Sequence, residues 1–255
     1  MIRSIQHSRS FDVVYRLYIA AFFVYLAAPL TVVCVFAFND SSLASLPWRG
    51  FTLDWFLAAG DEGRTGLFHD RRLMDSLGVS ARVAIAVTIV SVTLGTMNAF
   101  LFERFDFPGK NMLYMAMLLP LVIPGVILGV SILVFSSTVA NQAWDRLGLD
   151  LGLLRPGLLL VVLGQASFIA TLCTLIISAR LRKFDLALEE AALNLGASRP
   201  TALLTVTIPY LRPAIIGAAI MAFLMSFENF NTTLMLVGSD APVTITLFNR
   251  LREGS

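Results

Sequence analysis

A polar island, Glu190-Ala191-Ala192-Leu193-Asn194-Leu195-Gly196, interrupts this chain between two long apolar runs, and Val206-Thr207-Ile208-Pro209 begins ten residues after its glycine. The flanking runs cover residues 157–179 and 213–237. Each is long enough to cross roughly 30 Å of hydrocarbon as a helix, which takes about 20 residues. The island is therefore predicted to be a loop that joins two membrane spans.

Composition agrees with a membrane protein. Hydrophobic residues make up 57% of the 255-residue chain and charged residues only 14%, which leaves too little polar surface to cover a soluble domain. The net charge of +2 indicates neither a nucleic acid nor an acidic partner. Cys34 and Cys173 each lie in an apolar run, so we expect buried thiols and no disulfide framework.

Five apolar runs are long enough to span a membrane. They are residues 13–38, 76–102, 111–135, 157–179 and 213–237. Helices satisfy their own backbone hydrogen bonds in lipid, and the short alternating strands of a barrel are missing from the sequence. The first run is too long and too aromatic for a cleaved signal peptide, so it is predicted to be a retained span. We expect an all-α membrane protein with a single transmembrane domain over residues 1–255.

The distribution of basic residues predicts the orientation. With a cytoplasmic N-terminus, ten arginines and lysines fall on the cytoplasmic side and eight outside, which is a small bias in the expected direction. This orientation makes residues 180–212 the longest cytoplasmic segment and places residues 39–75 outside. The outer segment contains Trp48 and Trp55 among many charges, and it predicts a short interfacial helix followed by a mobile loop that contains Gly60 and Gly63.

Local signals divide residues 180–212 into a helix, a turn and a second helix. Asp185 is a candidate N-cap, and Glu189 and Glu190 lie in early turns where the helix dipole favours carboxylates. Gly196 suits the left-handed position that ends a helix. The first helix is therefore predicted to be short, amphipathic and exposed.

The second helix of this segment is bounded by capping and breaking residues. Ser198 is a candidate N-cap, and Pro200 fits in the first turn, where its missing N–H costs nothing. We expect Pro209 and Pro213 to end this helix and to turn the chain back into the bilayer.

The island resembles the EAA loop of the permease subunits of bacterial ABC importers. The matching positions are Glu190, Ala191, Ala192, Gly196, Val206, Ile208 and Pro209. Val206 replaces the commoner isoleucine and Ile208 the commoner leucine. In that family the loop forms a coupling helix seated in a groove of a cytoplasmic ATPase, so the resemblance implies an ATPase-coupling role for Glu189, Glu190, Ala191, Ala192, Gly196 and Pro209. An ordinary capped pair of cytoplasmic helices is the alternative.

The resemblance covers nearly the whole chain and is strongest to the polyamine (spermidine/putrescine) branch. It rests on the segments 38–42, 50–56 and 104–110. It implies a type I importer helical bundle in a bacterial inner membrane. The implied partners are a second homologous permease, two ATPase subunits, and a periplasmic solute-binding protein that meets the outer segment. Such permeases have a further span after the fifth, so a sixth helix is expected beyond Ser255, and a genuine five-span subunit is the alternative.

Glu228 is the strongest candidate for substrate contact, because an ionised carboxylate inside an apolar run costs several kcal/mol unless it faces water or a partner. The candidate pathway residues are Glu228, Asn229, Asn231, Phe227 and Phe230. An ammonium ligand would suit the carboxylate, and a phenyl ring could add a cation–π contact. The polyamine relatives carry an acidic pair at positions 228 and 229, and this chain keeps only the first acid.

Structural roles remain open for the same residues. Glu228 could form an ion pair or a hydrogen bond across a dimer interface, for instance with Arg82, and the two asparagines could bond neighbouring helices. The expected cargo is a small cationic, polyamine-like solute, with iron, opines or amino-acid-like solutes as alternatives.

Two further polar or flexible features allow both functional and structural interpretations. The stretch 120–129 contains Pro120, Pro124, Gly125 and Gly129, which predicts a kinked helix with a small-residue face that serves as a gate hinge or merely packs closely. Gln165 and Ser167 are expected mainly to bond neighbouring helices.

The sequence offers no catalytic constellation. His7 and His69 are isolated, and neither a phosphate-binding loop nor a zinc-ligand spacing occurs. We expect no cofactor, no metal and no enzymatic activity, so that ATP hydrolysis belongs to the partner ATPase. A self-sufficient channel or secondary transporter is the competing class, but the internal repeats typical of secondary transporters are missing.

Overall fold

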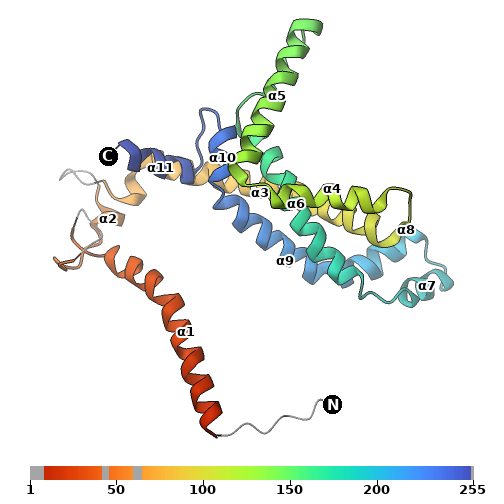
Figure 1. Ribbon diagram of the computed structural model, residues 1–255, viewed down its shortest axis with the longest axis horizontal. Helices are drawn as coiled ribbons and strands as arrows, with labels where there is room; N and C mark the ends of the chain where they lie inside the picture. The colour runs from red at the N-terminus through yellow and green to blue at the C-terminus, as the bar shows by residue number, and fades with distance from the viewer. Residues whose placement is uncertain (1–8, 42–45, 60–64, 254–255) are drawn as a thin grey trace. The chain divides into compact units, whose positions relative to one another are not determined.

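The computed structural model describes residues 9–41, 46–59 and 65–253, and the chain divides into two compact units, residues 1–74 and 75–255. Helices account for almost all of the regular structure, as Figure 1 shows. In the described residues, extended pairing is confined to two isolated bridges, Asn39 with Phe51 and Ala59 with Thr65. The fold class is therefore all-α, as the sequence predicts.

The first unit begins with α1 (Arg9–Phe36), none of whose described side chains is buried within the chain. An apolar helix without internal cover is stable only against lipid or another polypeptide. Cys34 is exposed on this helix, so the prediction that both cysteines are buried holds for Cys173 alone. The described residues of the first unit leave this thiol uncovered.

A compact turn follows α1 and is organised around Asn39, which is fully buried. Its side-chain oxygen accepts a hydrogen bond from the Arg49 N–H, and its carbonyl accepts one from the Trp55 indole, each at 2.9 Å. The interfacial helix predicted here is a single turn, α2 (Asp54–Leu57), before the 3-10 turn η1 (Leu67–His69). The predicted mobile loop falls largely on residues 60–64, outside the described residues.

The second unit is a helical bundle that α3 (Arg71–Arg104) enters from the first unit. The remaining long helices are α4 (Lys110–Val122), α5 (Gly125–Leu147), α6 (Leu158–Leu181) and α9 (Ile208–Phe227). The shorter elements are η2 (Gly152–Leu154), α7 (Ala187–Asn194), α8 (Arg199–Ala202), the π-helical turn η3 (Leu203–Thr207), α10 (Asn231–Leu236) and α11 (Val243–Glu253).

Helix α6 lies at the centre of the bundle and has the most buried face. Ile169, Cys173 and Ile177 of α6 are almost fully buried in a core shared with α3 and α9. Gly95 brings α3 close to α6, because a Cβ at this position would lie 2.5 Å from the Cys173 Cβ. An all-round apolar helix such as α6 is expected in this central position.

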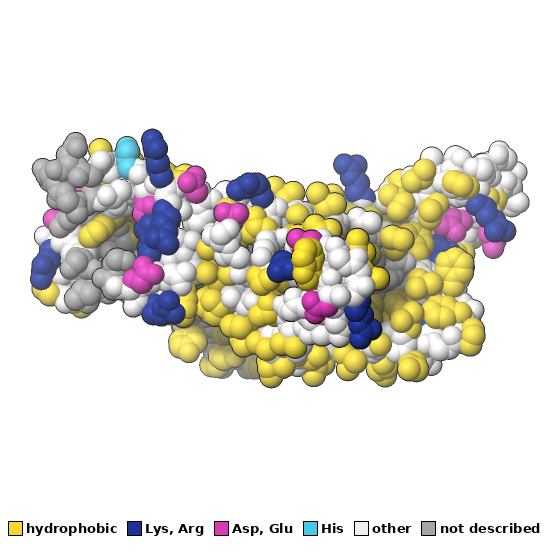
Figure 2. Space-filling model, turned by 90° about the horizontal axis from the view of Figure 1, so that it is seen from above, with side chains coloured by type: hydrophobic (Ala, Val, Ile, Leu, Met, Phe, Trp, Pro, Cys, Tyr) yellow, Lys and Arg dark blue, Asp and Glu magenta, His cyan; other side chains and the backbone are white. Residues whose placement is uncertain are grey.

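Five helices of the described chain are long and apolar enough to cross a membrane. They cover residues 10–36, 71–104, 125–147, 158–181 and 199–227. Hydrophobic side chains also cover a large part of the molecular face in Figure 2. Burying so much apolar surface requires a bilayer or partner chains.

The third predicted span is wrong as a single helix. The run 111–135 is divided between α4 and α5, and the break falls at Ile123 and Pro124, which both have extended backbone. Pro120, by contrast, is accommodated inside α4. A proline disfavours helical backbone at the residue before it, which places the break at Ile123.

The predicted stop at Pro209 and Pro213 is also wrong. Helical backbone continues from Arg199 through η3 and α9 to Phe227. Pro209 stands in the first turn of α9, directly after the π-helical turn, and Pro213 lies inside the helix. A widened π turn locally changes the hydrogen-bonding register, and it allows a proline to follow without ending the helix.

The fifth predicted run, 213–237, is interrupted as well. Helix α9 ends at Phe227, and α10 begins only at Asn231. Glu228 therefore lies at a helix end and not inside a continuous span. Such breaks are tolerated in membrane proteins where other groups satisfy the freed backbone.

Candidate functional site: the α7 loop and the α9–α10 break

The loop between α6 and α9 is built by the local signals that its sequence carries. The Asp185 carboxylate accepts the Ala187 N–H at 3.0 Å, and Gly196 adopts a left-handed φ of +90° after α7. The Ser198 hydroxyl accepts the Thr201 N–H at 3.3 Å at the start of α8. These contacts define a short helix, a tight turn and a second helix, as expected.

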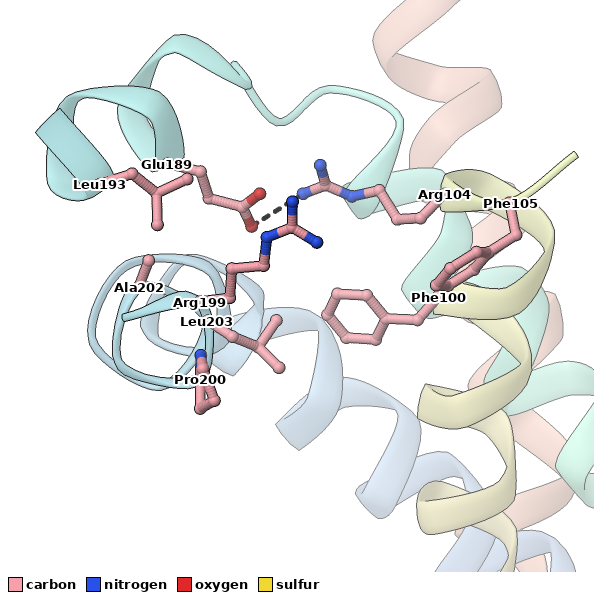
Figure 3. A pocket seen from close by; sticks show the side chains of 9 residues that line it. All are labelled: Phe100, Arg104, Phe105, Glu189, Leu193, Arg199, Pro200, Ala202 and Leu203. Carbon is pink, nitrogen blue, oxygen red and sulfur yellow. Dashed lines mark hydrogen bonds and ion pairs between the residues drawn. The ribbon is translucent and has the colours of Figure 1, made fainter. Parts of the chain in front are cut away.

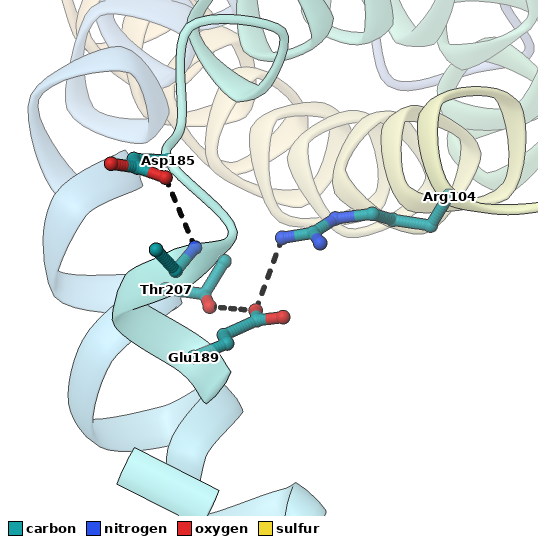
Figure 4. A network of polar contacts seen from close by, with 5 residues as sticks. Arg104, Asp185, Glu189 and Thr207 are labelled. Atoms are coloured by element: carbon teal, nitrogen blue, oxygen red, sulfur yellow. Dashed lines mark hydrogen bonds and ion pairs between the residues drawn. The ribbon is translucent and has the colours of Figure 1, made fainter. Parts of the chain in front are cut away.

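Glu189 points inward from α7 and holds this helix to the bundle. Its Oε1 lies 3.1 Å from a guanidinium nitrogen of Arg104 on α3 and also accepts a hydrogen bond from the hydroxyl of Thr207 in η3 (Figure 4). The Glu189 side chain is only 23% exposed and that of Arg104 19%. Because α3, α7 and η3 meet at one carboxylate, α7 is connected directly to α3 and to the helix that continues into α9.

A second set of contacts surrounds this connection. Arg182 donates to the Glu103 carboxylate at 2.8 Å, and this bond raises the pKa of the Arg182 guanidinium above its ordinary value. Arg104 lies over the Phe184 ring at 5.4 Å, and Phe184 packs edge-on against Tyr210 of α9 at 5.1 Å. The end of α3, the residues after α6 and the start of α9 are thus joined around the α7 loop.

The other side of α7 is exposed and unusually apolar for a loop helix. Glu190 and Ala191 are exposed, Ala192 is half-buried, and the Glu190 side chain has no partner in the described chain. Exposed leucines of this loop include Leu186, Leu188 and Leu195, of which Leu195 is 90% exposed. A small apolar surface with one free carboxylate can bind a complementary groove.

The sequence missed both partners of Glu189. In the sequence, Arg104 counts among the basic residues that predict the orientation, and it begins the family-like segment 104–110. Nothing in the sequence pairs it with Glu189, which lies 85 positions away. Thr207 lies between two EAA-type positions, and no sequence signal marks its hydroxyl as a ligand of Glu189. Pro209 is exposed at the start of α9. It belongs neither to the contacts around Glu189 nor to the exposed surface of α7.

The α9–α10 break holds the second group of predicted residues. Glu228 is exposed, and no ion pair involves it within the part of the chain that the structure describes. Within the described residues the suggested partner, Arg82, donates to the Gly78 carbonyl of its own helix at 3.3 Å. A Glu228–Arg82 ion pair across a dimer interface stays a prediction.

A buried hydrogen-bond chain joins the two sides of the α9–α10 break, where Glu228 lies. Gln165 of α6, 1% exposed, accepts from the Ser226 hydroxyl and donates to the Thr233 hydroxyl at 2.8 Å. Thr233 in turn donates both its hydroxyl and its backbone N–H to Asn229, at 3.0 and 3.2 Å. Gln165 therefore bonds both sides of the break, as its predicted interhelical role requires, and Asn229 caps α10 locally.

The remaining pathway candidates lie around this chain. Asn231 is exposed at the start of α10, and its side chain forms no hydrogen bond in the described chain. Phe227 stacks on Phe223, and Phe230 packs against Phe248 of α11 with ring centroids 5.0 Å apart. Of the predicted pathway residues, Glu228 and Asn231 are the polar ones whose side chains have no partner in the described part of the chain.

Small residues let α10 pack closely, which confirms the predicted small-residue face. A Cβ on Gly125 would lie 3.2 Å from the Asn231 Cβ, and one on Gly129 would lie 3.0 Å from the Met235 Cβ. A Cβ on Gly164 of α6 would likewise lie against the Leu236 Cδ1. The α4–α5 break and the α9–α10 break therefore lie against each other, so the kinked stretch 120–129 packs beside the predicted pathway residues.

Comparison with known families identifies the class of protein. Residues 89–253, more than half of the chain, match the family "Binding-protein-dependent transport system inner membrane component". The chain belongs to this family and is a permease subunit of a type I ABC importer, a multi-pass inner-membrane protein.

Individual relatives place it near the polyamine branch. It is 30% identical over 237 residues to the putrescine transport system permease protein PotI of Escherichia coli K12, covering 91% of this chain and 78% of PotI. It is 24% identical to the spermidine/putrescine permease PotC of the same strain, covering 87% and 75%. It is also 29% identical to the molybdenum permease ModB of Haemophilus influenzae over 177 residues, covering 68% and 76%.

A solved structure has the same fold. The crystal structure of a bacterial ABC transporter that imports the acidic polysaccharide alginate superposes with a TM-score of 0.63. The match covers 97% of this chain and 82% of that one, at 15% sequence identity. The two chains share an architecture.

Proposed function

We propose that this chain is the permease subunit of an ATP-driven importer of a small organic cation, and that a separate ATPase docks on α7. The observation that carries the proposal is the two-sided character of α7. Glu189 fixes its inner side to α3 and η3, while Glu190, Ala191 and exposed leucines cover its outer side. An anchored helix with an unoccupied apolar face is suited to transmit a partner's movement.

The coupling would proceed as a shift between two arrangements of the bundle. Nucleotide-driven closure of two ATPase subunits moves α7, and the Glu189 contacts carry that movement to α3 and α9 (Figure 4). The free-energy difference between inward-facing and outward-facing states is supplied by ATP. A second permease completes the pathway, and a periplasmic binding protein delivers the solute. This scheme places α7 and the N-terminus in the cytoplasm.

Reversing the charge of Glu190 tests the docking step. With Glu190→Arg, we expect at least tenfold less ATPase to co-purify with the permease from membranes, because the exposed carboxylate meets the partner directly. The matched control is Asp145→Arg, an exposed acid on α5 far along the chain from the loop. Full ATPase recovery with Glu190→Arg would reject α7 as the docking site. Uptake by this chain alone in liposomes would instead indicate an autonomous transporter.

The cationic cargo is inferred from Glu228. Its carboxylate is exposed at a helix break and has no charged partner in the described chain. A carboxylate at membrane depth favours a cation and repels an anion. The named solutes of PotI and PotC, putrescine and spermidine, carry ammonium groups that fit this site, whereas the molybdenum permease ModB is the relative that favours a different cargo.

Neutralising Glu228 tests this assignment. Glu228→Gln in the reconstituted complex is expected to lower kcat/KM for radiolabelled putrescine roughly tenfold, the loss of one charge-assisted contact. Complex assembly should be unchanged, and Glu253→Gln, an exposed acid at the end of α11, serves as the control. Unaltered uptake kinetics would exclude Glu228 from the pathway. Competition by molybdate but not by putrescine would reject the cationic cargo.

A further inference from the structure

A pocket of about 610 Å³ opens between the end of α3, α7 and the start of the continuous helix at α8 (Figure 3). This volume lies within the range of about 300 to 1,000 Å³ that is usual for small-molecule sites. Its lining residues are Phe100, Arg104, Phe105, Glu189, Leu193, Arg199, Pro200, Ala202 and Leu203. Most of the wall is apolar, and all of the charge is at one side.

The charge in this pocket is unbalanced. Two guanidinium groups, from Arg104 and Arg199, point toward the Glu189 carboxylate from different sides in Figure 3. Arg104 pairs with that carboxylate at 3.1 Å, and Thr207 occupies the same oxygen. The Arg199 side chain has no hydrogen bond or ion pair anywhere in the described residues. The pocket therefore holds one positive charge without a partner.

The level of the pocket in the membrane indicates what could balance that charge. Phe100 lies one turn before the end of α3, and Phe105 is exposed directly after it. The apolar wall is thus continuous with the end of a membrane span, and the two arginines lie just beyond it. An acyl chain contacts the first region and a headgroup phosphate the second, as for basic pockets that bind anionic lipids.

We propose that this pocket binds an anionic phospholipid, with its phosphate at Arg199 and one acyl chain against Phe100, Phe105 and Leu203. A free phosphate ion gains nothing from an apolar wall of this extent. A lipid gains from both parts of the site. The assignment is independent of the cargo and of ATPase docking on the outer face of α7.

Occupancy would stiffen the loop, because the lining residues come from α3, α7 and α8. Leu193 lies on α7 and Leu203 on the helix that leads into α9. A lipid between them bridges elements that otherwise meet mainly through Glu189. The site thus connects membrane composition to the position of α7.

Lipid titration of the purified complex tests the proposal. We would add phosphatidylglycerol or phosphatidylcholine with the same acyl chains and count retained lipids by native mass spectrometry. Arg199→Gln is expected to weaken phosphatidylglycerol retention about fivefold, which corresponds to about 1 kcal/mol for one basic side chain near an anionic surface. Arg212→Gln, an exposed arginine on α9 outside the pocket, should have no effect. Leu203→Trp, which fills the apolar part without changing charge, should also weaken retention.

Three outcomes would overturn the proposal. Equal losses with Arg199→Gln and Arg212→Gln would indicate only general attraction to a charged surface. Displacement of phosphatidylglycerol by millimolar inorganic phosphate would indicate a simple anion site. A photoreactive residue at position 203 that crosslinks to the ATPase instead of to lipid would assign the pocket to a protein partner.

Discussion

The α7 loop and the α9–α10 break use buried polar groups in opposite ways. In the loop a charged residue, Glu189, is satisfied by tertiary partners, while its neighbour Glu190 is exposed. At the break the neutral residues Ser226, Gln165, Thr233 and Asn229 satisfy one another, and the charged residue Glu228 is exposed. In both places one polar group supports the fold, and an adjacent carboxylate is exposed without a partner in the described residues.

This difference has an energetic reason. A neutral hydrogen-bond chain can lie inside a bundle at modest cost, because no charge is desolvated. A partly buried carboxylate such as that of Glu189 is stabilised by a cation, and Arg104 supplies one at the end of α3. The pair therefore belongs at the loop and the amide network belongs in the core. The following three predictions test this division.

The largest effect is expected at Gln165. Gln165→Leu removes a hydrogen bond on each side of the break and leaves the Ser226 and Thr233 hydroxyls without this buried partner. We expect a loss of about 1 to 3 kcal/mol in unfolding free energy, measured by SDS titration. Gln142→Leu, at an exposed position of α5, is the matched control and should change little. Equal effects of the two substitutions would show that the network does not support the break.

A smaller effect is expected from the connection of α7 to α3. In a double-mutant cycle of Arg104→Gln and Glu189→Gln, we expect a coupling energy of about 0.5 to 1 kcal/mol, because the pair is partly exposed and solvent screens it. ATP hydrolysis per transported solute should rise in both single variants as the loop loosens. A coupling energy near zero with unchanged stoichiometry would show that the contact does not transmit movement.

The smallest effect is expected at the exposed pair Lys110 and Asp106, 2.8 Å apart beside the same loop. The hydrogen bond from Lys110 lowers the pKa of Asp106 below its ordinary value of 3.8. The lowered pKa contributes stability that is fully present above about pH 4 and is lost as the pH falls through the lower folded value. Asp106→Asn should make the acid limb of the stability profile shallower. An unchanged profile between pH 5 and pH 2 would contradict the pairing.

Much of the α7 loop could be predicted because its signals are local. Asp185, Gly196 and Ser198 act on backbone groups within three residues, so their roles follow from short-range geometry. The breaks in the spans were less predictable. Ile123 ends α4 before Pro124, whereas Pro209 follows the π turn η3 and Pro213 lies inside α9 without ending it. A proline in the sequence therefore does not by itself predict where a helix ends.

The sequence by itself determined the membrane class, the helical fold, the capped loop and the family, because hydropathy, caps and motif spacing act over short stretches of chain. Only the tertiary structure decided that Glu189 binds Arg104 and Thr207 while Glu190 is free, and that Gln165 joins α6 to both sides of the α9–α10 break. These contacts join residues up to 85 positions apart, and only the packing of the helices brings them within hydrogen-bonding distance.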